Sequence, residues 1–125
     1  MATRIRRAGV AVALALLMAT ALAGAANAAT LVGTAGLDQL IGTRNDDTLY
    51  GLSGWDYIVG KPAAYELYGG KGSDPLEGRY GNDYLVGGRG EDEIEGGYGT
   101  DHIEAADGRY DFVNCGPGES EHASV

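Results

Sequence analysis

Residues 87–104 read GGRGEDEIE followed by GGYGTDHIE, two copies of one nine-residue pattern. The same interval extends outward from this stretch through a column of first-position residues: Gly33, Gly42, Gly51, Gly60, Gly69, Gly78, Gly87, Gly96 and Ala105. Self-similarity at a fixed period is the sequence signature of a repeat architecture. The segment from 33 to 113 is therefore interpreted as nine tandem units.

Two further positions of the unit are nearly constant. The eighth position is always aliphatic or aromatic: Leu40, Leu49, Ile58, Leu67, Leu76, Leu85, Ile94, Ile103 and Phe112. The sixth position is Asp38, Asp47, Asp56, Asp74, Asp83, Asp92 or Asp101, with Tyr65 and Tyr110 as the two exceptions. Glycines at the first, second and fourth positions favour a turn with positive φ, and positions seven to nine favour an extended strand.

This pattern predicts a parallel β-roll. In a three-residue strand the eighth side chain points one way and its two neighbours point the other, so each unit turns one apolar residue inward. A single unit cannot bury that residue alone, and stacking is the available remedy. Two units make one coil of 18 residues, and successive coils stack as parallel strands about 4.8 Å apart. The predicted fold is all-β, a two-sheet β-solenoid of about nine half-turns.

The same stacking lines up the sixth-position carboxylates along two edges. Unit charges about 4.8 Å apart repel by roughly 1 kcal/mol even in water, and one apolar residue in nine makes a thin core. A hard divalent cation between successive turns reverses the repulsion by binding carboxylate and main-chain oxygens. Calcium suits such a pliable site better than magnesium. Zinc and copper favour imidazole or thiolate ligands, which only His102, His122 and Cys115 could supply.

The predicted cofactor is therefore several Ca²⁺ ions, and a short set of oxygen atoms could hold them. The candidate carboxylate ligands are Asp38, Asp47, Asp56, Asp74, Asp83, Asp92 and Asp101. The candidate main-chain ligands are carbonyls near Gly36, Gly54, Gly70, Gly72, Gly81, Gly88, Gly90, Gly97 and Gly99.

These units resemble the G-G-x-G-x-D-x-U-x nonapeptide of the hemolysin-type calcium-binding repeat, or repeats-in-toxin (RTX), β-roll family. Residues 69–77 (GGKGSDPLE), 87–95 and 96–104 match that pattern closely, and the earlier units match it more loosely. The resemblance implies a calcium-binding turn over the first six residues of each unit and a short strand over the last three. It implies ligation by Asp74, Asp83, Asp92 and Asp101.

Three departures from the pattern are local. Residues 60–68 (GKPAAYELY) have Ala63 for glycine and Tyr65 for Asp, so we expect no full calcium site there and a break between Asp47 and Asp83. The other edge, from Asp38 to Asp92, is unbroken and is expected to be better occupied. Pro75 lacks a backbone donor and is expected to weaken strand pairing.

The end of the repeat is irregular. Sliding the frame by one residue places Asp111 in the sixth position and Val113 in the eighth, so Ala105 is interpreted as a one-residue insertion. Residues 105–125 are then expected to form a degenerate terminal repeat, or cap, and a tail, because terminal units of solenoids are often atypical. Residues 29–104 form the predicted β-roll.

Residues 1–28 fall outside the repeat and are interpreted as a secretory signal peptide. Three arginines open the segment, an apolar run covers residues 8–23, and Ala26-Asn27-Ala28 is a small-residue cleavage pattern. The alternative, a membrane anchor, would want roughly 20 strongly apolar residues. The predicted location is secreted or at the cell surface, with no membrane span after cleavage.

Charge and cysteine content restrict the partners. Cleavage removes three of the nine basic residues and no acidic one, which leaves 6 Lys plus Arg against 18 Asp plus Glu, a net charge of −12. This field disfavours nucleic acid and anionic membranes and favours cations. Cys115 has no second cysteine to pair with, and its role stays open. No catalytic motif or paired His–Cys arrangement is found, so the chain is predicted not to be an enzyme.

The sequence predicts a secreted calcium-binding repeat protein that folds when it binds Ca²⁺. The alternative is a calcium-stabilised surface or matrix protein that binds carbohydrate, protein or itself through exposed tyrosines. Tyr50 with Tyr68, and Tyr80 with Tyr98, share positions one coil apart and should stack on the outside, either as surface packing or as a recognition face. Outward Ile41 and Val59 on an uncapped first coil offer an edge for self-association.

Overall fold

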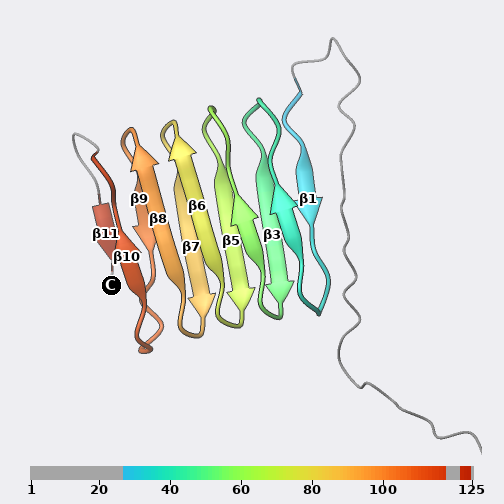
Figure 1. The fold of residues 1–125 in the computed structure, drawn as a ribbon, viewed down its shortest axis with the longest axis vertical. Coiled ribbons are helices and arrows are strands. Elements are labelled where there is room, and N and C mark those ends of the chain that lie inside the picture. The colour runs from blue at the N-terminus through green and yellow to red at the C-terminus, as the bar shows by residue number, and fades with distance from the viewer. Residues whose placement is uncertain (1–26, 118–121, 125) are drawn as a thin grey trace, which may run out of the picture.

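The computed structural model describes residues 27–117 and 122–124, with side chains described up to residue 117 (Figure 1). Every regular element among these residues is a strand, because each unit offers only three to six extended residues between glycine-rich turns. The strands are β1 (Thr30–Val32), β2 (Gln39–Ile41), β3 (Thr48–Ser53), β4 (Tyr57–Val59), β5 (Glu66–Lys71), β6 (Pro75–Tyr80), β7 (Tyr84–Arg89), β8 (Glu93–Tyr98), β9 (His102–Glu104), β10 (Phe112–Asn114) and β11 (His122–Ser124).

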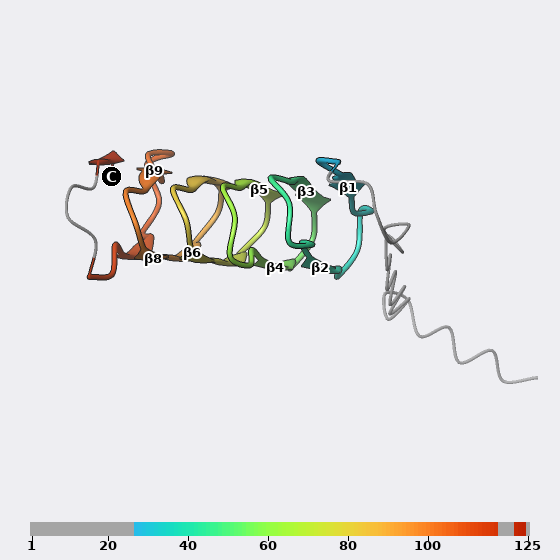
Figure 2. The ribbon, with the colours of Figure 1, turned by 90° about the horizontal axis from the view of Figure 1, so that it is seen from above.

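The strands form two parallel sheets that face each other across the coil axis (Figure 2). One sheet has the order β1-β3-β5-β7-β9-β11 and the other the order β10-β8-β6-β4-β2. Neighbouring strands are offset by one coil, so Leu49 pairs with Leu67 and Ile58 with Leu76. The predicted two-sheet parallel β-roll is confirmed.

The core is the single column of eighth-position side chains that runs between the sheets. All of them from Leu40 to Ile103 are at most 1% exposed. Leu31 on β1 joins them, nine residues before Leu40, so the roll begins one half-turn earlier than the glycine column indicates. Each coil buries two large apolar side chains in this way, one from each sheet, and Tyr65 adds a third in its own coil.

The predicted frame shift near the C-terminus is confirmed, but the extra residue lies elsewhere. Val113 on β10 pairs with Ile94, an offset of 19 residues, and packs against the core, while Phe112 is 65% exposed. Ala105 is only 2% exposed and takes the buried place of a first-position glycine. The additional residue is therefore accommodated in the exposed turn over residues 106–110, and not at Ala105 itself.

Pro75 interrupts the pairing of β4 with β6, as the sequence predicts. In other coils the seventh residue donates its N–H to the sixth residue of the coil before; for example, Glu93 donates to the carbonyl of Asp74 (3.0 Å). Pro75 has no N–H to donate, and the β4–β6 register begins at Ile58 with Leu76. The sheet tolerates this loss because the pairing of β6 with β8 on its other side is complete over five residues.

One prediction for the first coils is wrong. Ile41 is 38% exposed, as expected, but Val59 is only 2% exposed and does not face solvent. It lies between its register partners Ile41 on β2 and Glu77 on β6, which cover it although it is outside the main core. Within the described residues no helix is long and apolar enough to cross a membrane. The signal-peptide prediction falls almost wholly on residues 1–26, outside the described part.

Candidate metal centre

Seven buried carboxylates line the two edges where the sheets meet. Each sixth-position Asp follows a turn and precedes a strand, and each is at most 2% exposed. Odd and even units alternate between the edges, so the members are Asp38, Asp56, Asp74 and Asp92 on one edge and Asp47, Asp83 and Asp101 on the other. Burial removes these carboxylates from water, so they require hydrogen-bond donors or a cation to compensate for the lost hydration.

In six of the seven carboxylates, all but Asp38, one oxygen accepts a backbone N–H from the preceding coil. Oδ1 of Asp74 accepts the backbone N–H of Asp56 at 2.8 Å, and Oδ1 of Asp92 accepts that of Asp74 at 2.9 Å. On the other edge Oδ1 of Asp83 accepts the N–H of Tyr65 at 2.9 Å, and the Asp101 carboxylate accepts that of Asp83 at 3.0 Å. The repeated Asp therefore connects residues that lie 18 apart in the chain.

The second oxygen of four of these carboxylates has no protein donor. Oδ2 of Asp56, Asp74, Asp83 and Asp92 is buried and accepts no hydrogen bond from the described residues. A buried acceptor without a partner costs about 1 to 3 kcal/mol, and more when it is charged. Native proteins rarely leave such atoms unsatisfied unless an ion or ligand supplies the missing interaction.

The first-position glycines have no side chain, and this leaves room for the carboxylate oxygens. A Cβ added to Gly51 would stand 2.5 Å from Oδ2 of Asp56 and 2.6 Å from the carbonyl oxygen of Gly69, one coil later. A Cβ added to Gly69 would likewise meet Oδ2 of Asp74 at 2.8 Å and the carbonyl oxygen of Gly87 at 2.5 Å. At Gly51 and Gly69 the first position is therefore restricted to glycine by a carboxylate from its own unit and a carbonyl from the next coil.

Main-chain carbonyls approach the same turns from the neighbouring coils. The carbonyls of predicted candidates lie directly against glycines of the following coil; the oxygen of Gly54, for example, would stand 1.6 Å from a Cβ on Gly72. The predicted carbonyls in such contacts are those of Gly36, Gly54, Gly70, Gly72, Gly81 and Gly97. The predicted turn glycines with positive φ are Gly54, Gly70, Gly72, Gly81, Gly88, Gly90, Gly97 and Gly99.

Burial gives these carboxyls unusual proton affinity. Burial, together with the neighbouring charges of Asp74 and Asp38, raises the pKa of Asp56 to about 7 against a backbone hydrogen bond that lowers it. Burial likewise raises the pKa of Asp83 to about 7 and that of Asp92 to about 6. Without a cation, full ionisation of the ladder is unfavourable near neutral pH.

The donor set is one carboxylate per half-turn plus main-chain oxygen. Among the described residues no three His, Cys, Asp or Glu side chains converge on one point. A metal held here would take most of its ligands from carbonyls, which is the chemistry of a hard cation with flexible coordination such as Ca²⁺. The residues present therefore fit calcium.

Comparison with protein families agrees with this geometry. The model of the RTX calcium-binding nonapeptide repeat, four copies long, matches residues 32–62, 66–93 and 77–110. This chain belongs to the RTX calcium-binding nonapeptide repeat family. The RTX repeat binds several Ca²⁺ ions and is a structural calcium-binding unit rather than an enzymatic one. This RTX chain matches no curated protein and no solved structure.

The tyrosine pairs of the RTX chain stack as predicted. The rings of Tyr50 and Tyr68 are 4.8 Å apart at 12°, and those of Tyr80 and Tyr98 are 5.1 Å apart at 7°. Each stacked pair covers one face of either ring, and Tyr80 and Tyr98 remain 55% and 57% exposed. This geometry agrees with surface packing between coils. A carbohydrate-binding face stays a prediction.

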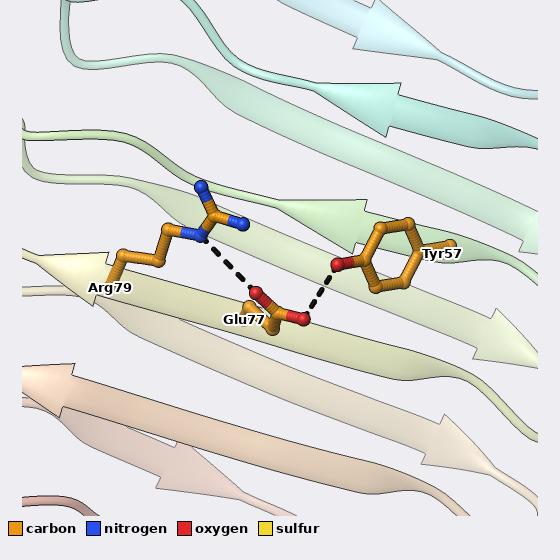
Figure 3. A network of polar contacts seen from close by, with 3 residues as sticks. All are labelled: Tyr57, Glu77 and Arg79. Atoms are coloured by element: carbon orange, nitrogen blue, oxygen red, sulfur yellow. Dashed lines mark hydrogen bonds and ion pairs between the residues drawn. The ribbon is translucent and has the colours of Figure 1, made fainter.

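A polar cluster also links strands on the outer face of the other sheet (Figure 3). The hydroxyl of Tyr57 on β4 donates to Oε1 of Glu77 on β6 at 2.6 Å, and Nε of Arg79 donates to Oε2 of the same carboxylate at 3.2 Å. Arg79 occupies the second position with a φ of 77°, a positive value like those of Gly70, Gly88 and Gly97 at the same position of their units. The Tyr57–Glu77 bond joins neighbouring coils outside the core, and Arg79 contacts the same carboxylate from within β6.

Proposed function

We propose that this RTX chain is a secreted, non-catalytic calcium-binding protein whose folding is coupled to Ca²⁺ binding. The observation that carries the proposal is the set of buried Oδ2 atoms without donors on Asp56, Asp74, Asp83 and Asp92. These oxygens, with carbonyls of the glycine turns, would hold the ions. Asp101 has the same place in its unit and belongs to the proposed ligand set.

Coupling to folding follows from what the chain lacks without metal. Two large apolar residues per coil make a thin core, and no disulfide is available because Cys115 is the only cysteine. The proposed mature chain carries 6 basic against 18 acidic residues, so the folded state concentrates negative charge. When bound, Ca²⁺ supplies positive charge and oxygen coordination between coils, and its binding free energy becomes folding free energy.

Millimolar extracellular calcium suits this behaviour, because modules of this kind bind with dissociation constants of about 10⁻⁴ to 10⁻³ M. A chain exported before it meets that concentration would stay unfolded inside the cell and fold outside. The interpretation of residues 1–28 as a signal peptide supports this route. N-terminal sequencing of protein recovered from the medium tests it, and a mature chain that still begins at Met1 would contradict it.

The main experiment is a calcium titration of the mature chain. Far-UV circular dichroism in excess chelator should show little strand signal, and added Ca²⁺ should produce it cooperatively, with isothermal titration counting the ions. Asp92→Asn should lower the count, whereas the control Glu91→Gln, on the exposed neighbour in the same turn, should not. A chain with the same strand signal in chelator and in calcium would overturn the coupling.

A further inference from the structure

The turns of the first two units differ from the later ones at the second position. Thr34 and Thr43 stand there, where five of the seven later units have glycine or a residue with positive φ such as Leu52. In the second unit the backbone N–H of Thr43 donates to Oδ2 of Asp47 at 2.6 Å, and the Thr43 hydroxyl donates to the same atom at 2.7 Å. The chain itself therefore satisfies the oxygen that the later units leave without a donor.

Both oxygens of Asp47 are accounted for by protein groups. Oδ1 accepts the backbone N–H of Ala29 at 2.8 Å, and Oδ2 accepts the two bonds from Thr43. In the first unit, protein donors satisfy only one of the two carboxylate oxygens of Asp38. Thr34 donates from its N–H (2.5 Å) and its hydroxyl (2.9 Å) to Oδ2 of Asp38, but Oδ1 of Asp38 has no donor among the described residues.

Tyr65 closes the same turn from the next coil. Its side chain is 1% exposed, and its hydroxyl donates to the carbonyl oxygen of Thr43. A Cβ added to Gly42 would meet the Tyr65 ring at 2.2 Å, where the equivalent atom on Gly51 would meet a carboxylate and a carbonyl oxygen. The ring thus fills the space between these two coils that oxygen atoms line elsewhere.

We propose that Thr43, Asp47 and Tyr65 form a metal-free clasp that replaces one calcium site of the ladder. The clasp joins the coil of Asp47 to the coil of Tyr65 by hydrogen bonds and a buried ring, and neither depends on calcium. Asp47 then serves as a structural acceptor and not as the calcium ligand that its column predicts. This inference rests on the proposed function, because it decides which sites of the ladder take the metal.

The clasp implies a polarity of order along the roll. In chelator, the half-turns of residues 42–50 and 60–67 keep their hydrogen bonds, whereas the half-turn of Asp56 and the half-turns from Gly69 onward depend on oxygens that have no donor among the described residues, those of Asp56, Asp74, Asp83 and Asp92. The N-terminal coils would then be a preformed surface on which calcium orders the rest. Solenoid folding by propagation from one end is compatible with nearest-neighbour coupling between repeats.

Calcium counting on the mature chain tests the clasp directly. Asp47→Asn should leave the number of bound ions unchanged, while Asp74→Asn should lower it. Tyr65→Asp, which restores the repeat pattern, should add one ion. A loss of ions in Asp47→Asn equal to that in Asp74→Asn would overturn the clasp.

Two mild variants guard against a failure of Asp47→Asn to fold. Tyr65→Phe keeps the ring and removes the hydroxyl, and Thr43→Val keeps the shape and removes the donor. Each should lower the melting temperature without changing the calcium count. The controls are Tyr68→Phe, whose hydroxyl makes only an exposed 3.3 Å contact with Glu66, and Thr100→Val in an exposed turn position. Equal behaviour of variants and controls would contradict the clasp.

Hydrogen exchange separates this inference from the proposed function. In chelator, peptides from residues 42–50 and 60–67 should exchange at least tenfold more slowly than peptides from residues 69–104, and calcium should remove the difference. Uniform fast exchange in chelator would overturn the clasp but keep calcium-coupled folding. Uniform protection in chelator would overturn calcium-coupled folding, and the Tyr65→Phe and Asp47→Asn comparisons would still decide the clasp.

Discussion

The backbone nitrogen of Asp56 lies 2.8 Å from Oδ1 of Asp74, its counterpart one coil later. The same bond recurs between Asp74 and Asp92. The two oxygens of Asp74 and of Asp92 therefore have different roles. Oδ1 connects the coils through a main-chain donor, and Oδ2 remains buried without one. A substitution can therefore remove the charge of the side chain and still keep the connection between coils.

Asp74→Asn removes the charge of the side chain and keeps the hydrogen bond that connects the coils. The Asn carbonyl oxygen can still accept the N–H of Asp56, but the neutral amide no longer supplies a negative ligand. We expect the calcium concentration at the folding midpoint to rise about tenfold, because interactions with a charged buried group contribute roughly 1.5 to 3 kcal/mol. Circular dichroism against calcium concentration measures it, with Glu95→Gln on the exposed face of β8 as control. An unchanged midpoint would contradict the role of Asp74.

Gly51→Ala tests the close approach between coils. The new Cβ would stand 2.5 Å from Oδ2 of Asp56 and 2.6 Å from the Gly69 carbonyl oxygen, so one of them must move. We expect a loss of about 1 to 3 kcal/mol in saturating calcium, the usual range for overpacking. Gly108→Ala is the contrasting control: no atom lies within 4 Å of its added Cβ, and its cost comes from a positive φ (85°), which Gly51 does not have. Chemical denaturation compares the two, and a Gly51→Ala variant as stable as the unsubstituted chain would contradict the close approach.

Val113→Ala and Phe112→Ala test the frame at the C-terminus. Val113 packs against the core beside Ile94, whereas Phe112 is 65% exposed. Removal of the two Val113 methyl groups should cost about 1 kcal/mol or more, and truncation of Phe112 should cost less than about 0.5 kcal/mol. Thermal melts in saturating calcium decide between them. A larger loss of stability in Phe112→Ala than in Val113→Ala would indicate that Phe112, and not Val113, points into the core.

The pH dependence of the metal-free chain follows from the raised carboxyl pKa values. Unfolded Asp titrates near 3.9, whereas the folded pKa is about 7 for Asp56 and Asp83 and about 6 for Asp92. Between these values the folded state binds more protons than the unfolded state, so its stability falls as the pH rises from about 4 to 7. In chelator, the strand signal should be stronger at pH 5 than at pH 8.

Calcium should reverse that dependence, because it binds the ionised carboxylates and competes with protons for them. The calcium midpoint should therefore be lower at pH 8 than at pH 5. Paired titrations at the two pH values, with and without chelator, give both slopes. A midpoint that does not change with pH would show that the buried carboxylates are not the ligands.

Much of the fold could be read from periodicity. The nine-residue repeat predicts the inward column from Leu40 to Ile103 and the stacked Tyr50–Tyr68 pair. Strand alternation fixes which side chains point inward, and the 18-residue coil fixes which residues are neighbours in the sheet. The apolar column also indicated the frame shift to Val113. The buried half-turn of Leu31 was missed because it lies before the first clear glycine, although its spacing of nine from Leu40 was a usable signal.

The candidate ligands could be named from the sequence as a column, but their differences could not. Asp47 and Asp74 occupy the same position of the repeat. Both oxygens of Asp47 accept hydrogen bonds, whereas one buried oxygen of Asp74 has no donor among the described residues. The reason is that a column position sets which edge a carboxylate faces, whereas its donors come from residues at other positions and in other coils. Ala29, Thr43 and Tyr65 meet around the turn of Asp47 only when three coils are stacked.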